Sequence, residues 1–126
     1  MRLRVLIADD SETMRSAIVR LIKENPELEV VGESGTFAQT LELTAALKPD
    51  VLLLDLLMPD EDDFATETVK LHLLHNTGCI LAISIWIEPE ARARAEALGA
   101  KALLDKAHLY SELTDSIKSL CYSKQL

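Results

Sequence analysis

This sequence alternates short apolar runs with longer stretches of helical periodicity, five times over. Apolar residues at every third or fourth place indicate amphipathic helices, whereas short continuous apolar runs indicate strands buried on both faces. Strands separated by helices are expected to run parallel, because a parallel pair needs a long crossover connection. The expected strands are Val5–Ala8, Val30–Gly32, Val51–Leu54, Ile80–Ile83 and Ala102–Leu104. The pattern predicts an α/β fold, a doubly wound sandwich with helices on both faces of a parallel sheet.

Helices are expected after each of these strands. The first can be capped by Asp10 or Ser11, the third is expected from Asp63 to His75, and Gly99 is expected just past the end of the fourth. The predicted inward positions are Met14, Ala17, Ile18, Leu21 and Ile22 in the first helix, Phe37, Leu41 and Ala45 in the second, Ala91, Ala95 and Leu98 in the fourth, and Leu109, Leu113, Ile117 and Leu120 in the fifth.

The composition favours one globular domain over residues 1–126, with a folded core from about 3 to 122. The net charge of −8 argues against a nucleic-acid surface, since phosphate binding depends on clustered Lys and Arg. No apolar run approaches the length of a membrane span, and the N-terminal segment does not fit a signal peptide, so the expected compartment is the cytoplasm. Cys79 and Cys121 are expected to be reduced, inert thiols.

Polar residues follow four of the expected strands. They are Asp9 and Asp10 after the first, Asp55 after the third, Ser84 after the fourth, and Asp105 and Lys106 after the fifth. In a parallel sheet all the strand carboxyl ends share one edge, and ligands bind in the crevice there. The topology therefore predicts that carboxylates, a hydroxyl and an amine converge at a single site.

Carboxylates held close together repel one another, and the low dielectric of a strand end strengthens the repulsion. Either some of them protonate or a cation joins them, and oxygen ligands suit Mg²⁺ together with phosphate oxygens. A carboxylate can also act as a nucleophile and form aspartyl-phosphate. Asp55, on the central strand, is the candidate nucleophile. Lys106 would add a second positive charge, and Ser84 would donate to a phosphoryl oxygen.

Asp9-Asp10, Asp55 within the segment DLLMP, Ser84 and Lys106 together resemble the site of a response-regulator receiver domain of two-component signalling systems. The resemblance covers essentially the whole chain. The segments MRLRVLIADDSETMR and ELEVVGES look most like receivers of DNA-binding transcription factors of the LuxR or NarL class. The resemblance to receiver domains implies a flavodoxin-like (βα)5 sandwich with the strand order 2-1-3-4-5.

The resemblance also implies that a sensor histidine kinase or a phosphotransfer protein donates a phosphoryl group to Asp55. The implied ligands of Mg²⁺ or Mn²⁺ are Asp9, Asp10, Asp55 and the backbone carbonyl of Leu57. Ser84 would turn toward the phosphoryl group, and Lys106 would pair with it. The domain would be a phosphoacceptor with intrinsic phosphotransfer and self-dephosphorylation rather than a turnover enzyme.

Phosphorylation would shift a two-state surface near the fourth helix, fifth strand and fifth helix. The output would reach a downstream protein or a C-terminal DNA-binding domain missing from this chain, and so regulate transcription. The domain itself is expected to bind neither nucleic acid nor membrane, and self-association is left open.

Several positions depart from the family's pattern. Ala107 replaces the proline that usually follows the lysine, so a trans bond and a shifted Lys106 are predicted. Leu103 occupies the aromatic output-switch position, and Ile85 replaces a small residue and would crowd the phosphoryl site. Asp63 stands where glycine is common. These departures put conventional switching in doubt more than phosphoryl acceptance.

Two loops carry further candidate residues. Leu57 and Trp86 are expected at the rim of the acidic pocket, where we hypothesise that they hinder the hydrolytic water and lengthen the lifetime of phospho-Asp55. Trp86 is equally compatible with protein contact and with packing. His72 and His75 are interpreted as a solvated helix face, and the acidic run Asp60–Asp63 as an exposed loop that favours the start of the third helix.

Two other function classes compete with the phosphoacceptor. A receiver-like interaction module that works without phosphorylation is motivated by Ala107, Leu103 and Ile85. An aspartyl phosphatase is disfavoured, because Leu57 stands where such enzymes carry their general acid.

Overall fold

The computed structural model describes residues 2–121, and a five-stranded parallel sheet forms its middle layer. The strand order is β2-β1-β3-β4-β5, which confirms the flavodoxin-like sandwich. The strands are β1 (Leu3–Ala8), β2 (Leu28–Ser34), β3 (Val51–Asp55), β4 (Cys79–Ser84) and β5 (Ala102–Asp105). Most of them extend one or two residues beyond their apolar runs, because pairing with a neighbouring strand holds their polar ends.

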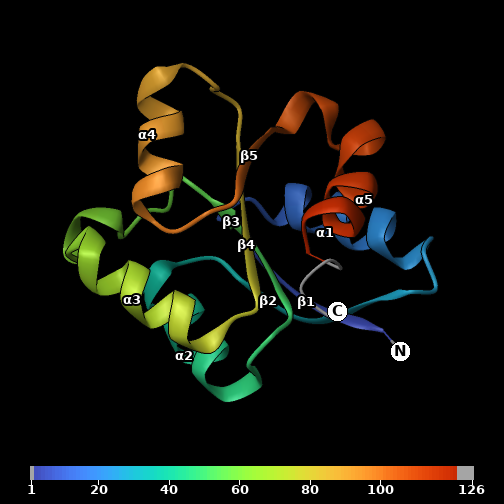
Figure 1. Ribbon diagram of the computed structural model, residues 1–126, viewed down its shortest axis with the longest axis horizontal. Coiled ribbons are helices and arrows are strands. Elements are labelled where there is room, and N and C mark those ends of the chain that lie inside the picture. The colour runs from blue at the N-terminus through green and yellow to red at the C-terminus, as the bar shows by residue number, and fades with distance from the viewer. Residues whose placement is uncertain (1, 122–126) are drawn as a thin grey trace.

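Five α-helices cover the two faces of this sheet. They are α1 (Glu12–Lys23), α2 (Phe37–Leu47), α3 (Thr66–Asn76), α4 (Pro89–Ala97) and α5 (Leu109–Leu120), with short 3₁₀ turns η1 (Glu61–Asp63) and η2 (Lys106–His108). Helices α1 and α5 lie on one face, and α2, α3 and α4 lie on the other (Figure 1). Ser11 caps α1 by accepting a hydrogen bond from Met14 N, and Gly99 follows α4 with a φ of 90°, both as predicted.

Each face of the sheet has its own hydrophobic core, because successive side chains of a strand point to opposite faces. On β3, for example, Leu53 packs toward α1 and α5, whereas Leu52 and Leu54 pack toward α2, α3 and α4. Burial of one such side chain contributes roughly 1.5–3 kcal/mol. The continuous apolar runs that predicted parallel strands therefore contribute side chains to both cores.

Helix α2 matches the prediction at two of its three inward positions, since Leu41 packs against the core together with Phe37. Phe37 is buried as expected, but Ala45 is exposed, and the polar residues Thr40 and Thr44 are buried instead. Thr40 can be buried because its hydroxyl hydrogen-bonds to the Ser34 hydroxyl at 2.6 Å and donates to its own helix backbone. Local hydrogen bonds allowed threonine to replace an apolar residue at this face.

Helix α3 begins at Thr66, later than predicted, because the acidic run is used elsewhere. The Asp60 carboxylate accepts hydrogen bonds from Phe37 N at 2.7 Å and Ala38 N at 3.0 Å, which caps the N-terminus of α2. Phe64 then adopts an extended conformation and packs edge to face on Phe37, with ring centroids 6.4 Å apart. The acidic run therefore stabilises the second helix rather than the third.

A disulfide joins Cys79 at the start of β4 to Cys121 at the end of α5, so the expectation of reduced thiols is wrong. The two Cα atoms lie 5.7 Å apart although the cysteines are separated by 42 positions in the sequence. Both side chains are buried in the core beneath α5. Within residues 2–121 no helix is long and apolar enough to cross a membrane.

Candidate functional site

The candidate site lies at the carboxyl ends of the central strands, where the predicted polar residues meet. The register pairs Ala8 with Leu54, which places Asp9 beside Asp55. Asp55 is in turn paired with Ile83 of β4, so Ser84 follows at the same edge. Oxygen atoms of Asp9, Asp10 and Asp55 all lie within 4.8 Å of one another. Convergence of these three carboxylates, inferred from topology alone, is confirmed.

Lys106 lies between the two buried acids. Its Nζ is 2.7 Å from Asp9 Oδ2 and 3.3 Å from Asp55 Oδ2. The peptide bond to Ala107 is trans, as predicted, and this trans bond does not remove the lysine from the site. Burial alone would lower the pKa of Lys106, but the two carboxylates outweigh it and hold that pKa above its usual value. Lys106 is therefore a permanent cation here.

The carboxyl group of Asp55 has an unusually high pKa. Burial raises its pKa, the hydrogen bond from Leu57 N opposes that rise, the neighbouring Asp9 adds to it and Lys106 opposes it, with a resulting pKa of about 6. Leu57 N donates to Asp55 Oδ1 at 3.1 Å. One oxygen of the carboxylate is thus fixed by backbone and the other by an ammonium group. The metal-free site holds more negative charge than Lys106 alone can balance.

The three carboxylates fit a divalent cation. Asp9 Oδ2 is buried and has no well-aligned hydrogen-bond donor among residues 2–121, although Lys106 Nζ is close. Asp10, in contrast, is exposed and open to solvent. Two buried acids and one solvent-facing acid make an oxygen-only donor set that leaves room for water, as Mg²⁺ prefers. The residues present therefore match the metal that the sequence led us to expect.

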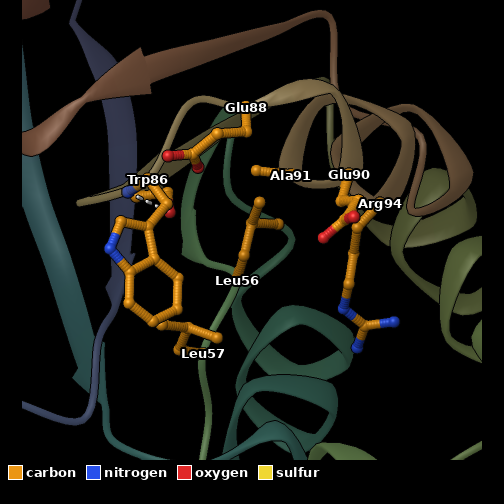
Figure 2. A pocket seen from close by; sticks show the side chains of 8 residues that line it. Leu56, Leu57, Trp86, Glu88, Glu90, Ala91 and Arg94 are labelled. Atoms are coloured by element: carbon orange, nitrogen blue, oxygen red, sulfur yellow. Dashed lines mark hydrogen bonds between the residues drawn. The ribbon is translucent and has the colours of Figure 1, made fainter.

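Ser84 and the loop after it border a pocket beside the acids. The Ser84 side chain is buried, and its Oγ accepts a hydrogen bond from Trp86 N at 3.0 Å. Figure 2 shows the Trp86 indole over Leu57 on one side of this pocket and Arg94 on the other. Trp86 is 56% exposed and Leu57 41%, so neither is a core residue. They line this pocket beside Ser84, and their place at the rim of the acidic cluster itself stays a prediction.

The other residues singled out in the sequence lie outside the acidic cluster. Ile85 is 59% exposed, and Leu103 is half-buried against the core under α4. His72 is not solvated as interpreted, because its Nε2 lies 2.8 Å from the Leu41 carbonyl oxygen, whereas His75 is exposed. Sequence reasoning missed Arg94, which lines the same pocket and pairs with Glu61 at 3.2 Å. No local pattern marks that pair, because the partners come from separate elements.

Comparison with known proteins identifies the family to which this site belongs. Residues 5–118 match the response regulator receiver domain. The chain is a member of that family. Receiver domains share this sandwich: the response regulator domain of Thermotoga maritima CheB superposes with a TM-score of 0.82 at 23% identity, covering 97% of this chain and 98% of that one.

Two curated relatives show where such receivers occur. The chain is 30% identical over 123 residues to the DNA-binding transcriptional activator DevR/DosR of Mycobacterium tuberculosis, covering 98% of this chain and 56% of that protein. It is 34% identical over 125 residues to a protein-glutamate methylesterase/protein-glutamine glutaminase of Hydrogenovibrio crunogenus, covering 92% of this chain and 32% of that protein. The receiver therefore spans between about a third and a half of these longer relatives.

Proposed function

We propose that this receiver accepts a phosphoryl group on Asp55 and thereby shifts a conformational equilibrium that controls a partner. The observation that carries the proposal is the buried Asp55 carboxylate, held between Leu57 N, Asp9 and the Lys106 ammonium group. Such fixed geometry suits a nucleophile, since positioning and electrostatic stabilisation supply most of the catalysis in phosphoryl transfer.

The transfer begins when Asp55 Oδ2 attacks phosphorus. A P–O bond forms, and the bond to the donor breaks, which is P–N for a phosphohistidine and P–O for an acyl phosphate. Lys106 then pairs with the transferred group, because it already lies 3.3 Å from that oxygen. Ser84 Oγ accepts from Trp86 N, which leaves its hydroxyl proton free to donate to a phosphoryl oxygen.

Asp9, Asp10, Asp55 and the Leu57 carbonyl would hold Mg²⁺ or Mn²⁺. When bound, the metal supplies charge neutralisation between the attacking carboxylate and the phosphoryl oxygens. The buried Asp9 carboxylate would be shared between the metal and Lys106, since Lys106 Nζ already lies 2.7 Å from its Oδ2.

We further propose that a sensor histidine kinase or a phosphotransfer protein supplies the phosphoryl group in the cytoplasm. The DNA-binding relative supports an output to transcription, through a DNA-binding domain or a separate downstream protein. Leu103 would be the output position on β5. Leu103 is aliphatic and half-buried, and it carries no hydroxyl group. A change of state there would therefore alter its packing against the core and would not expose a hydroxyl to a partner.

The test is incubation of the protein with acetyl phosphate and Mg²⁺, followed by mass spectrometry of the intact chain. We expect a phosphate adduct that disappears in Asp55→Asn and persists in Asp115→Asn, a control that removes an exposed acid on α5. Omission of Mg²⁺ should suppress the adduct. An adduct that forms equally well in Asp55→Asn, or none in the wild type, would contradict the proposal.

A further inference from the structure

Four of the large apolar side chains exposed in this structure belong to the loops that follow β3 and β4. They are Leu57, Ile85, Trp86 and Ile87, with between 39% and 59% of each side chain exposed. We call these four residues the tryptophan patch. Exposed apolar residues that gather in one place mark interaction sites, whereas isolated ones need no explanation. Leu57 and Trp86 line the same pocket, which marks this part of the patch as a place for an interaction.

The patch borders a pocket of about 180 Å³, which has room for one side chain but not for a cofactor. Leu56 and Ala91 contribute apolar surface within it, and Leu57 and Trp86 line one side (Figure 2). An extended aliphatic chain fits such a lining. The indole face also attracts a cation, because the ring carries negative potential above its plane.

Charge at the rim decides what kind of side chain fits. Glu88 and Glu90 both line the pocket, and the structure records no ion pair for either carboxylate within residues 2–121. The pocket's one lining cation, Arg94, is already paired with Glu61 at 3.2 Å and lies 3.4 Å from the Thr66 hydroxyl. The rim therefore keeps a net negative charge, which favours a cationic occupant.

We propose that the pocket binds a lysine or arginine side chain of a partner protein, whose neighbouring apolar residues cover the tryptophan patch. The aliphatic stem lies along Leu56 and Ala91, as long cationic side chains do on apolar surfaces. The charged head lies by Trp86, Glu88 and Glu90. This docking does not depend on phosphorylation of Asp55, so the two proposals can fail separately.

Two other occupants are disfavoured by the same charges. A second copy of this chain, placed by a two-fold axis, would bring the Glu88 and Glu90 carboxylates of one protomer toward those of its partner. The chain's net charge of −8 adds to that repulsion. An anionic lipid surface would be repelled in the same way. A basic, partly apolar protein segment satisfies both the patch and its rim.

The experiment uses the unphosphorylated protein and a short blocked peptide of alternating leucine and arginine, with a second peptide in which glutamate replaces arginine. Trp86 is the only tryptophan, so its emission reports binding directly, and NMR amide shifts locate the peptide. We expect saturable binding of the basic peptide alone, with shifts centred on residues 56–57 and 84–94.

The matched variants decide whether the rim is responsible. Glu88→Gln with Glu90→Gln should weaken binding by roughly threefold or more, since opposite charges at an interface contribute to its affinity. Glu29→Gln with Glu42→Gln removes the same charge from exposed positions on β2 and α2 and should have a smaller effect. Equal effects of the two pairs, equal binding of the acidic peptide, or no saturable binding would overturn the proposal. So would self-association in sedimentation velocity that Trp86→Ala abolishes.

Discussion

Asp55 and Asp60 lie on the same short stretch of chain, yet their surroundings shift their pKa values in opposite directions. Burial raises the pKa of Asp55 to about 6. Burial also acts on Asp60, but the hydrogen bonds that it accepts from Ala38 N and Phe37 N outweigh it and lower its pKa. The first acid destabilises the metal-free fold when it ionises, and the second stabilises it. This difference separates the proposed phosphoacceptor from a structural carboxylate.

Asp55→Asn should stabilise the metal-free protein at neutral pH. The folded state binds the Asp55 proton more tightly than the unfolded state does, so wild-type stability falls as pH rises from about 4 to beyond 6. Asparagine removes that penalty, and we expect a gain of roughly 1–3 kcal/mol at pH 7. Urea unfolding in a chelator measures it. The gain should vanish near pH 4, and a gain independent of pH would contradict this account.

Asp60→Ala should remove the cap of α2 and cost about 1–2 kcal/mol at neutral pH. Because the folded-state pKa of Asp60 is lowered, its contribution is present above the ordinary value of 3.8 and is lost as pH falls through the folded pKa. Urea unfolding at several pH values measures the difference. Asp62→Ala, an exposed acid of the same run, is the control and should change stability little.

At the scale of elements, the loops after β3 and β4 form one pocket together with the start of α4. Leu57 and Trp86 come from different loops and meet at the pocket rim, where Ser84 Oγ bonds to Trp86 N. The loop after β3 is anchored at two points. Asp60 accepts a hydrogen bond from the N-terminus of α2, and Glu61 forms an ion pair with Arg94 of α4. Both rim residues are therefore presented from anchored segments.

Replacing Leu57 and Trp86 together with serine should accelerate loss of phosphate from Asp55. The reason is that bulky apolar groups at the rim restrict the approach of the hydrolytic water, a prediction that rests on the proposed phosphorylation. The decay of the phosphorylated chain, followed by mass spectrometry after removal of the donor, measures it. Leu71→Ser, which alters a similarly exposed leucine on α3, should leave the rate unchanged. An unchanged rate in the double variant would refute shielding.

The disulfide fixes the end of α5 to the start of β4, and its loss should destabilise the fold. For a loop of 42 residues the restriction of the unfolded chain gives about 4 kcal/mol, with measured values commonly 2–4. Thermal unfolding with and without a reducing agent measures the effect. The result bears on the proposed cytoplasmic location, since a cytoplasm favours free thiols. The Cys79→Ser, Cys121→Ser double variant should unfold at a lower temperature than the wild type, and a reducing agent should not change that temperature. A wild type indifferent to reductant would contradict the prediction.

At the scale of the whole molecule, the sheet concentrates charge in one place. Three acids and one lysine meet at the carboxyl edge, so the negative charge gathered there carries an electrostatic cost that a divalent cation would offset. Binding of a cation at this cluster would be coupled to folding, since the unfolded chain has no such site.

Mg²⁺ should therefore raise the unfolding temperature. At ten times its dissociation constant, the ion should add about 1.4 kcal/mol of stability, or a few degrees in Tm for a domain of this size. Asp10→Asn should reduce the shift, since Asp10 is exposed and contributes to the cluster. Thermal scans with added Mg²⁺ or chelator test this. An equal shift in Asp10→Asn would mean that the ion binds elsewhere.

The alternation of apolar runs was enough to predict the sheet and the edge at which its polar residues meet. The period of the apolar residues specified five strands with crossover helices, and parallel topology then forced Asp9, Asp55, Ser84 and Lys106 to one edge. Both inferences are local or follow from topology, which is why they could be made without coordinates. The strand order required the family resemblance.

Contacts between distant segments could be seen only in the folded chain. Asp60 reaching α2, Glu61 reaching Arg94, and Cys79 meeting Cys121 join residues whose neighbours in sequence carry no sign of the partner. Such pairs depend on how helices are placed on the sheet, and packing of whole elements sets that placement. The same packing brought Leu57 and Trp86 to one pocket beside Glu88 and Glu90, which have no ion-pair partner within residues 2–121, a combination that no spacing in the chain encodes.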